Sequence, residues 1–137
     1  MTILSAAIPY RYNAEGELEI LLVTSRKKRR WVLPKGHVER GMGARSSAAK
    51  EAFEEGGVIG RTDTEPVANY ICKKRDAPEE EMYNVAVYPM MVLTEAPCWP
   101  EMHQRERRWA KISDALHLVE TKRLREALAA FDRAFRA

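Results

Sequence analysis

The chain has 137 residues, of which 45% are hydrophobic and 31% are charged, and its formal net charge is +3. This length suits one compact domain spanning residues 1–137, and the balance of apolar and charged residues excludes an intrinsically disordered chain. The two cysteines, Cys72 and Cys98, are far apart in the sequence. Neither a disulfide framework nor a zinc site is therefore expected, and a reduced cytoplasmic interior is the default location.

No apolar run is long enough to cross a membrane, and the N-terminus lacks a basic segment followed by an apolar one. We therefore expect neither a transmembrane helix nor a signal peptide. Five consecutive cations, RKKRR at residues 26–30, are either a solvated loop or a surface that meets phosphate. The sequence argues against a nucleic-acid partner, because the rest of the chain has no basic stripe with interleaved aromatic residues.

The first part of the chain predicts two strands joined by a turn. Residues 3–11 and 17–25 are apolar and partly β-branched, and the segment between them contains Asn13 and Gly16, which are common in turns. The second strand is almost continuously apolar, as expected of a strand that is buried on both faces. Residues 31–34 form a short extended segment that ends at a proline.

The middle of the chain predicts a helix followed by further strands. The helix spans about residues 44–55, and Gly56 or Gly57 can take the left-handed conformation that ends it. Pro89 lies inside an otherwise apolar strand, which predicts an edge position or a β-bulge because proline removes a ladder donor. The predicted strands are residues 58–60, 67–75 and 83–95, with a polar connection at residues 76–81.

The last part of the chain predicts a loop, a strand and two helices. Residues 97–107 contain two prolines and read as a loop, residues 108–112 as a strand, and Ser113 as the cap of a helical turn. From Thr121 onward, apolar residues recur at helical spacing, which predicts an amphipathic helix that packs against the core. Strands before and between helices, without regular alternation, predict an α/β fold in which helices cover a mixed sheet.

Three glutamates crowd the end of the predicted middle helix. Glu51, Glu54 and Glu55 occupy positions i, i+3 and i+4, which are neighbours on a helix surface, at the end where the helix dipole is already negative. These acids are either a solvated face or a cation site. A bound cation would remove the repulsion among them, and Mg²⁺ is the natural candidate because it prefers hard oxygen ligands and bridges carboxylates to phosphates. The residues expected to pack inward are Ala48, Ala49, Ala52 and Phe53.

The stretch from Gly36 to Val58 resembles the Nudix box. The box begins with a glycine, which is followed after five arbitrary residues by a glutamate and after seven more by the pair Arg-Glu. An aliphatic residue, one arbitrary residue and the pair Glu-Glu come next. One further arbitrary residue, a glycine and an aliphatic residue end the box. This chain matches at Gly36, Glu51, Ala52, Glu54, Glu55, Gly57 and Val58. Residues 25–39 and 105–116 are also similar to segments of those Nudix family members that cleave diadenosine polyphosphates or diphosphoinositol polyphosphates.

The resemblance implies an α/β/α sandwich with a central mixed sheet and a pyrophosphohydrolase activity on a small phosphorylated substrate. It implies that Glu51, Glu54 and Glu55, with the Gly36 carbonyl, hold Mg²⁺, with Mn²⁺ as an alternative. Glu51, or a carboxylate outside the box, would act as the general base. Together with the basic run, it suggests Arg26 and Lys35 as substrate-binding residues, although Lys35 also reads as a solvated lysine.

Two positions depart from the box. Its first glutamate is Met42 here and its arginine is Lys50, which keeps the charge but loses the planar fork of a guanidinium. The two changes either compensate each other or mark a Nudix-fold module that binds a phosphorylated ligand without cleaving it. Glu101 and Glu106, in the loop near the C-terminal end, are interpreted as polar surface, with an extra carboxylate for the site as the alternative.

Overall fold

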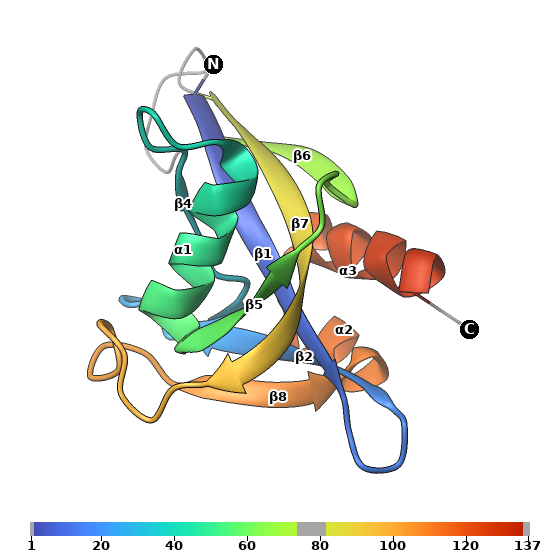
Figure 1. Cartoon of the computed structure of the whole chain (residues 1–137). Coiled ribbons are helices and arrows are strands. Elements are labelled where there is room, and N and C mark those ends of the chain that lie inside the picture. The colour runs from blue at the N-terminus through green and yellow to red at the C-terminus, as the bar shows by residue number, and fades with distance from the viewer. Residues whose placement is uncertain (1, 74–81, 136–137) are drawn as a thin grey trace.

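A computed structural model describes residues 2–73 and 82–135 of the chain. In this part the chain forms an eight-stranded sheet and three helices (Figure 1). The polar connection predicted at residues 76–81 lies outside the described residues. In chain order the elements are β1 Thr2–Tyr12, β2 Leu18–Thr24, β3 Trp31–Val32, β4 Lys35–His37, α1 Ala44–Gly56, β5 Val58–Thr62, β6 Ala68–Lys73, β7 Met82–Glu95, β8 Arg107–Lys111, α2 Ile112–Leu118 and α3 Lys122–Phe135.

The sheet is mixed, as the sequence predicts. Its main strand order is β3-β2-β1-β7-β5, and β1 pairs with β7 in parallel, whereas the other described strand pairs are antiparallel. Strand β1 pairs with β4 through residues Leu4 to Ala6 in its first half. It pairs with β2 through its last residues, Tyr10 to Tyr12. The short strand β4 is thereby fixed to the centre of the sheet, next to α1.

The helices cover the sheet on both faces. Helix α1 lies on one face, and α2 and α3 lie on the other (Figure 1). A smaller apolar cluster fills the space under α1 and includes Leu21, Ala48, Ala52 and Met90. A larger cluster fills the space under α2 and α3, where Phe131 is fully buried. This arrangement confirms the predicted α/β/α sandwich.

The predicted properties of the first strands are confirmed. In β2 the consecutive residues Ile20, Leu21, Leu22 and Val23 are all fully buried, so apolar packing covers both faces of the strand. The turn before β2 is held by Asn13, whose side-chain Oδ1 accepts hydrogen bonds from the main-chain N–H groups of two following residues.

The prediction for Pro89 is wrong, because β7 is neither an edge strand nor bulged at this residue. Strand β7 pairs with β1 along one side, and with β6 and then β5 along the other. In an extended strand the N–H and C=O of one residue face the same neighbour, and the Pro89 carbonyl accepts a hydrogen bond from the Asp63 N–H. The missing N–H therefore faces the gap between β6 and β5, where no ladder donor is needed.

Two short segments also differ from expectation. Residues 35–37, for which the sequence predicts no strand, form β4, whose pairing with β1 comes from tertiary contact and leaves no periodic signal in three residues. Ser113 does not cap α2, because β8 runs directly into the helix and Lys111 occupies the N-cap without a side-chain hydrogen bond.

The predicted C-terminal helix is confirmed as α3. Its apolar stripe lies on the sheet, with Leu124, Leu128 and Phe131 buried. The ring of Phe135 lies 4.9 Å from that of Tyr10 on β1, which extends the packing to the last turn. Among the described residues, no helix has both the length and the apolar character that crossing a membrane requires.

Candidate functional site

The three glutamates lie in the last turns of α1. The helix ends at Gly57, whose φ of 68° is left-handed and whose N–H donates to the Phe53 carbonyl. Of the two glycines predicted to end the helix, Gly57 therefore takes the left-handed conformation. Ala48 and Ala52 are buried under the helix as expected. Phe53 is only half-buried and belongs to neither apolar cluster, so the prediction that it packs inward is wrong.

Glu55, and not Phe53, points into the protein. The residue is 4% exposed, and a hydrogen bond from the Lys35 main chain reaches its carboxyl group. The Arg105 guanidinium Nη1 lies 3.6 Å from its Oε1. Burial raises the pKa of Glu55 to about 8, although Arg105 acts in the opposite direction. A carboxyl group placed in this way is a strong attractor for a cation.

Glu51 lies one turn earlier and packs against the main chain of β4. A Cβ atom added to Gly36 would stand 2.3 Å from Glu51 Oε1, so only glycine lets the carboxylate approach this closely. Burial raises the pKa of Glu51 to about 7, and the neighbouring Glu54 carboxylate adds to the increase. The glycine and the glutamate that the box places fifteen positions apart are thus in contact.

Glu54 forms an ion pair with Lys50, which lies one turn earlier on α1. The Lys50 ammonium lies 3.6 Å from Glu54 Oε1 and also pairs with Glu39. Met42 is half-buried in the turn before α1. Its N–H donates a hydrogen bond to the Glu39 carbonyl at 3.0 Å, which closes this turn. The acid that pairs with Lys50 in this chain is therefore Glu39, three residues before the position where the box has its first glutamate.

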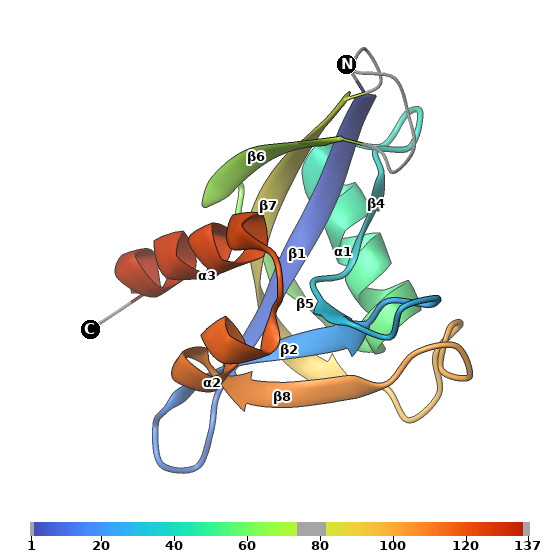
Figure 2. The ribbon, with the colours of Figure 1, turned by 180° about the vertical axis from the view of Figure 1, so that it is seen from behind.

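A loop far along the sequence covers the end of α1. Trp99 Nε1 donates to the Glu55 carbonyl at 3.1 Å, the Glu101 N–H to the Glu54 carbonyl at 3.0 Å, and Arg107 to the Gly56 carbonyl at 3.1 Å. These donors satisfy carbonyls that a helix end leaves without partners. Figure 2 shows this loop, between β7 and β8, beside the end of α1.

From the sequence, Glu101 and Glu106 in this loop are interpreted as polar surface, with an extra carboxylate for the site as the alternative. Glu101 is not simply polar surface: its Oε1 lies 2.7 Å from Arg105 Nε, and it raises the pKa of both Glu51 and Glu55. Glu106 stays at the exposed rim, 3.4 Å from Arg29. No spacing rule connects residues separated by 44 or more positions, so the sequence does not predict that this loop covers the end of α1.

The donor set suits a hard divalent cation. Glu51 and Glu55 offer carboxylate oxygens beside the main chain of β4. Burial raises the pKa of both groups, because their anionic forms lose contact with water and have too little positive charge nearby. Within residues 2–73 and 82–135, no three His, Cys, Asp or Glu side chains converge into a complete metal cage.

The two predicted substrate-binding cations lie in different places. Lys35 is exposed on β4, directly before Gly36, and lines a cavity of about 150 Å³ whose far wall includes Arg123. Arg26 is exposed in the loop after β2 and lines none of the described cavities. The structure thus brings Lys35, but not Arg26, to the strand that faces the glutamates.

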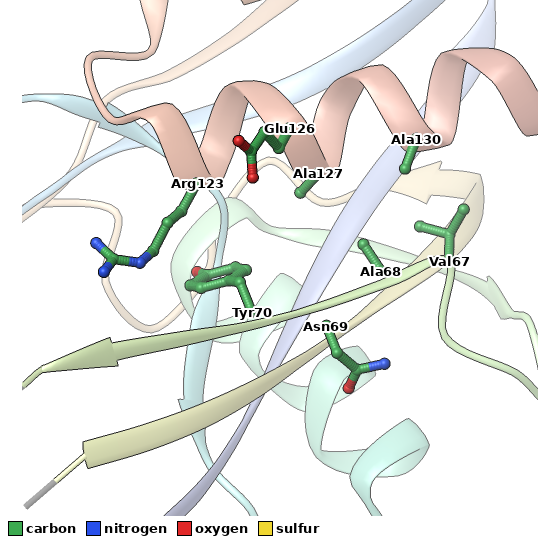
Figure 3. A pocket seen from close by; sticks show the side chains of 8 residues that line it. All are labelled: Val67, Ala68, Asn69, Tyr70, Arg123, Glu126, Ala127 and Ala130. Atoms are coloured by element: carbon green, nitrogen blue, oxygen red, sulfur yellow. The ribbon is translucent and has the colours of Figure 1, made fainter.

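A second cavity, of about 240 Å³, adjoins the first under α3. Figure 3 shows Tyr70 from β6 below Arg123 and Glu126 from α3, while Asn69 points to the other side of the strand. Tyr70 and Arg123 line both cavities, so the two form one furrow between β6 and α3. The carboxylates lie outside this furrow, which reaches them only through Lys35.

The comparisons with known proteins agree with this geometry. The family model described as NUDIX domain matches residues 1–131. Nudix hydrolase 21, chloroplastic, of Arabidopsis thaliana is 33% identical over 127 residues, which cover 90% of this chain and 63% of that protein. Diphosphoinositol polyphosphate phosphohydrolase 3-beta of Bos taurus is 29% identical over 112 residues, covering 80% and 65% of the two chains.

The chain therefore spans less than two thirds of the length of either relative. Among solved structures, an Ap4A hydrolase from C. elegans in a binary complex superposes with a TM-score of 0.73 at 19% identity, covering 98% of this chain and 97% of that one. That likeness concerns the fold, whereas the family match extends over almost the whole sequence. The chain belongs to the Nudix family, as residues 36–58 predicted.

Proposed function

We propose that the chain is a single-domain, magnesium-dependent Nudix pyrophosphohydrolase. It would cleave a phosphoanhydride bond in a nucleoside-diphosphate-linked or polyphosphorylated small molecule. The observation that carries this proposal is the Glu51 carboxylate packed on Gly36 with the buried Glu55 one turn behind it. A buried and a half-buried carboxyl group close together, both with a raised pKa, are typical of a functional site.

Glu51, Glu54 and Glu55, with the Gly36 carbonyl, would hold the Mg²⁺ ion, and Mn²⁺ is the expected substitute. The ion would supply positive charge to the bridging phosphates and lower the pKa of a water molecule bound to it. Glu54, which Lys50 draws aside, would turn toward the ion at the expense of an exposed ion pair, which is a small cost.

Glu51 is the proposed general base. Its carboxyl group is half-buried against Gly36, beside the proposed place of the ion, and without a bound ion burial raises its pKa to about 7. Glu101 is the candidate outside the box, since it stands on the loop that covers the end of α1. Either residue would take a proton from the attacking water.

Lys35 and Arg123 would neutralise the substrate. They line the same cavity, which reaches the glutamates only through Lys35, and two cations in one cavity favour a ligand that carries several phosphates. A diadenosine polyphosphate or a diphosphoinositol polyphosphate is the first substrate to test, in line with the names of the bovine relative and the nematode hydrolase. A nucleoside triphosphate is the second. Arg26 would act from the loop after β2.

The test is the Mg²⁺-dependent release of phosphate or nucleotide from a panel of these substrates. The wild-type protein should turn over at least one of them, and the Glu55→Gln variant should not. A panel without turnover for the wild-type protein, at millimolar Mg²⁺ and with Mn²⁺ as substitute, would refute the enzymatic assignment.

A second candidate function is a Nudix-fold module that binds a phosphorylated ligand without turnover. The observations that favour it are Met42 in place of a glutamate and Lys50 in place of an arginine. Calorimetric binding of a polyphosphorylated ligand without product release would support it. The cytoplasmic location stays a prediction, and two of the Arabidopsis relatives that match are named chloroplastic and mitochondrial.

A further inference from the structure

The position at which the Nudix box has an arginine is occupied by Lys50, and the ion pairs of Lys50 do not include the buried glutamate. Its ammonium pairs with Glu39 and with Glu54. A lysine is a compact point charge and lacks the planar fork with which an arginine holds two groups at once. Another cation is therefore needed to hold Glu55 in its buried place.

Arg105 contacts the buried glutamate from the opposite side. Its side chain is 10% exposed, and it has three partners in three directions. The Nε atom lies 2.7 Å from Glu101 Oε1, Nη1 lies 3.6 Å from Glu55 Oε1, and Nη1 donates to the Thr24 carbonyl at 3.0 Å. A planar group with three such anchors has little freedom to turn.

The main chain around Arg105 is fixed as well. Thr24 exchanges hydrogen bonds with Glu106, because its N–H donates to the Glu106 carbonyl and its Oγ1 accepts from the Glu106 N–H. The Arg105 N–H donates to the Glu101 carbonyl at 3.1 Å, and the Glu101 N–H donates to the Glu54 carbonyl at 3.0 Å. Helix α1, strand β2 and the loop before β8 therefore meet at this one side chain.

We propose that Arg105 is a positioning residue: it fixes Glu55 and Glu101 at the end of α1, where they face a divalent cation. The inference rests on the proposed function, because it concerns the same carboxylates. It assigns the support of the buried glutamate to a residue outside the box, fifty positions after Glu55.

The sign of the effect on metal binding separates positioning from plain charge. A guanidinium near the site repels a metal ion, so if charge alone mattered, removing Arg105 would tighten binding. If Arg105 positions the carboxylates, its removal leaves Glu55 and Glu101 without a support, and binding weakens instead. Loss of a group that orients metal ligands typically costs about 10- to 100-fold in affinity.

The experiment is a titration of the metal-free protein with Mn²⁺ alone, followed by electron paramagnetic resonance of the free ion, for the wild type, Arg105→Gln and Arg105→Lys. We expect a dissociation constant about 10- to 100-fold higher for Arg105→Gln. Arg105→Lys keeps the charge and serves if the glutamine variant fails to fold, and it should also bind more weakly than the wild type because an ammonium cannot anchor both acids.

Arg107→Gln is the matched control. Arg107 comes from the same segment and lies on the same helix end, but its hydrogen bonds go to the Gly56 and Ala96 carbonyls and its guanidinium stacks 3.9 Å from the Trp99 ring centroid. Its replacement should lower the melting temperature and leave the Mn²⁺ dissociation constant unchanged.

The outcomes are distinct. Tighter or unchanged Mn²⁺ binding by Arg105→Gln, or wild-type binding by Arg105→Lys, would overturn the role of Arg105 and leave the proposed function standing. A wild-type protein that binds no Mn²⁺ at all would overturn both. An equal loss of affinity in the Arg107→Gln control would show that any damage to this helix end weakens the site, which also overturns the specific role of Arg105.

Discussion

Glu55 shows at the scale of one residue how the site conflicts with stability. Its carboxyl group is buried, and its pKa rises from an ordinary 4.5 to about 8, while that of Glu51 rises to about 7. Between pH 4.5 and about pH 8 the folded state therefore binds protons that the unfolded state has already released. The stability that these groups contribute is fully present below pH 4.5 and is lost as the pH rises through about 7 and 8.

We therefore expect the melting temperature of the metal-free protein to fall between about pH 5 and pH 8.5. Scanning calorimetry in the presence of a chelator measures it. The Glu55→Gln variant should lose much of this slope, because its side chain does not titrate. Saturating Mg²⁺ should raise the melting temperature most at the alkaline end, where the carboxylates are ionised. A metal-free melting temperature that rises across this range would contradict the prediction.

Gly36 allows a test that separates function from folding. In Gly36→Ala the new Cβ would stand 2.3 Å from Glu51 Oε1. The end of a flexible side chain can move away at little cost, so the melting temperature should change little while Mn²⁺ affinity and turnover drop by at least about tenfold.

Gly43→Ala is the control for this variant, since nothing lies within 4 Å of its added Cβ and its φ of −72° is ordinary. It should behave as the wild type in both measurements. A Gly36→Ala protein with wild-type metal affinity would mean that the contact between Gly36 and Glu51 does not matter for the site.

At the scale of one element, the end of α1 depends on Gly57. In Gly57→Ala a side chain would have to adopt φ near 68°, and its Cβ would stand 2.7 Å from both Arg107 and Trp99. The left-handed conformation alone costs about 1 to 2 kcal/mol. We expect a larger loss in the free energy of unfolding, measured with urea, because the loop that covers the helix end must also shift.

Gly16→Ala isolates the conformational part of that loss. Gly16 has a φ of 78°, but nothing lies within 4 Å of an added Cβ. Its replacement should cost only the conformational strain. If the two variants lose the same free energy, the close packing of Trp99 and Arg107 on Gly57 contributes nothing.

How far the sequence predicts an element depends on where its partner lies. Helix α1, the buried strand β2 and the stripe of α3 were predictable because apolar period and terminating glycines are local signals. Strand β4, and the position of the predicted loop with Trp99 and Arg105 against the end of α1, were not predictable, because each depends on contacts with a segment far away in the chain. The resemblance to the box located Gly36 and the glutamates, but not their support.

At the scale of the whole molecule, the cations outside the box bear on substrate choice. Lys35 shares a cavity with Arg123, whereas Arg26 stands in a separate loop. Replacing Arg26 and Lys35 together by glutamine should raise KM more for substrates with four or five phosphates than for diphosphates, because longer chains meet more positive charge.

The single variants give the control, and Lys35→Gln should account for most of the change. Steady-state kinetics on a polyphosphate series measures it, with kcat expected to change less than KM. Equal increases in KM for long and short substrates would remove the proposed role in phosphate recognition.

The parallel pairing of β1 with β7 has a consequence for how the chain is made. Strand β1 is central, yet its parallel neighbour begins at Met82, about seventy residues later. A ribosome adding about 5 to 20 residues per second leaves that side of β1 open for roughly 4 to 14 s. During this interval an apolar strand edge is exposed to other nascent chains. We expect chaperones that bind nascent chains to matter most for this protein before β7 has left the exit tunnel.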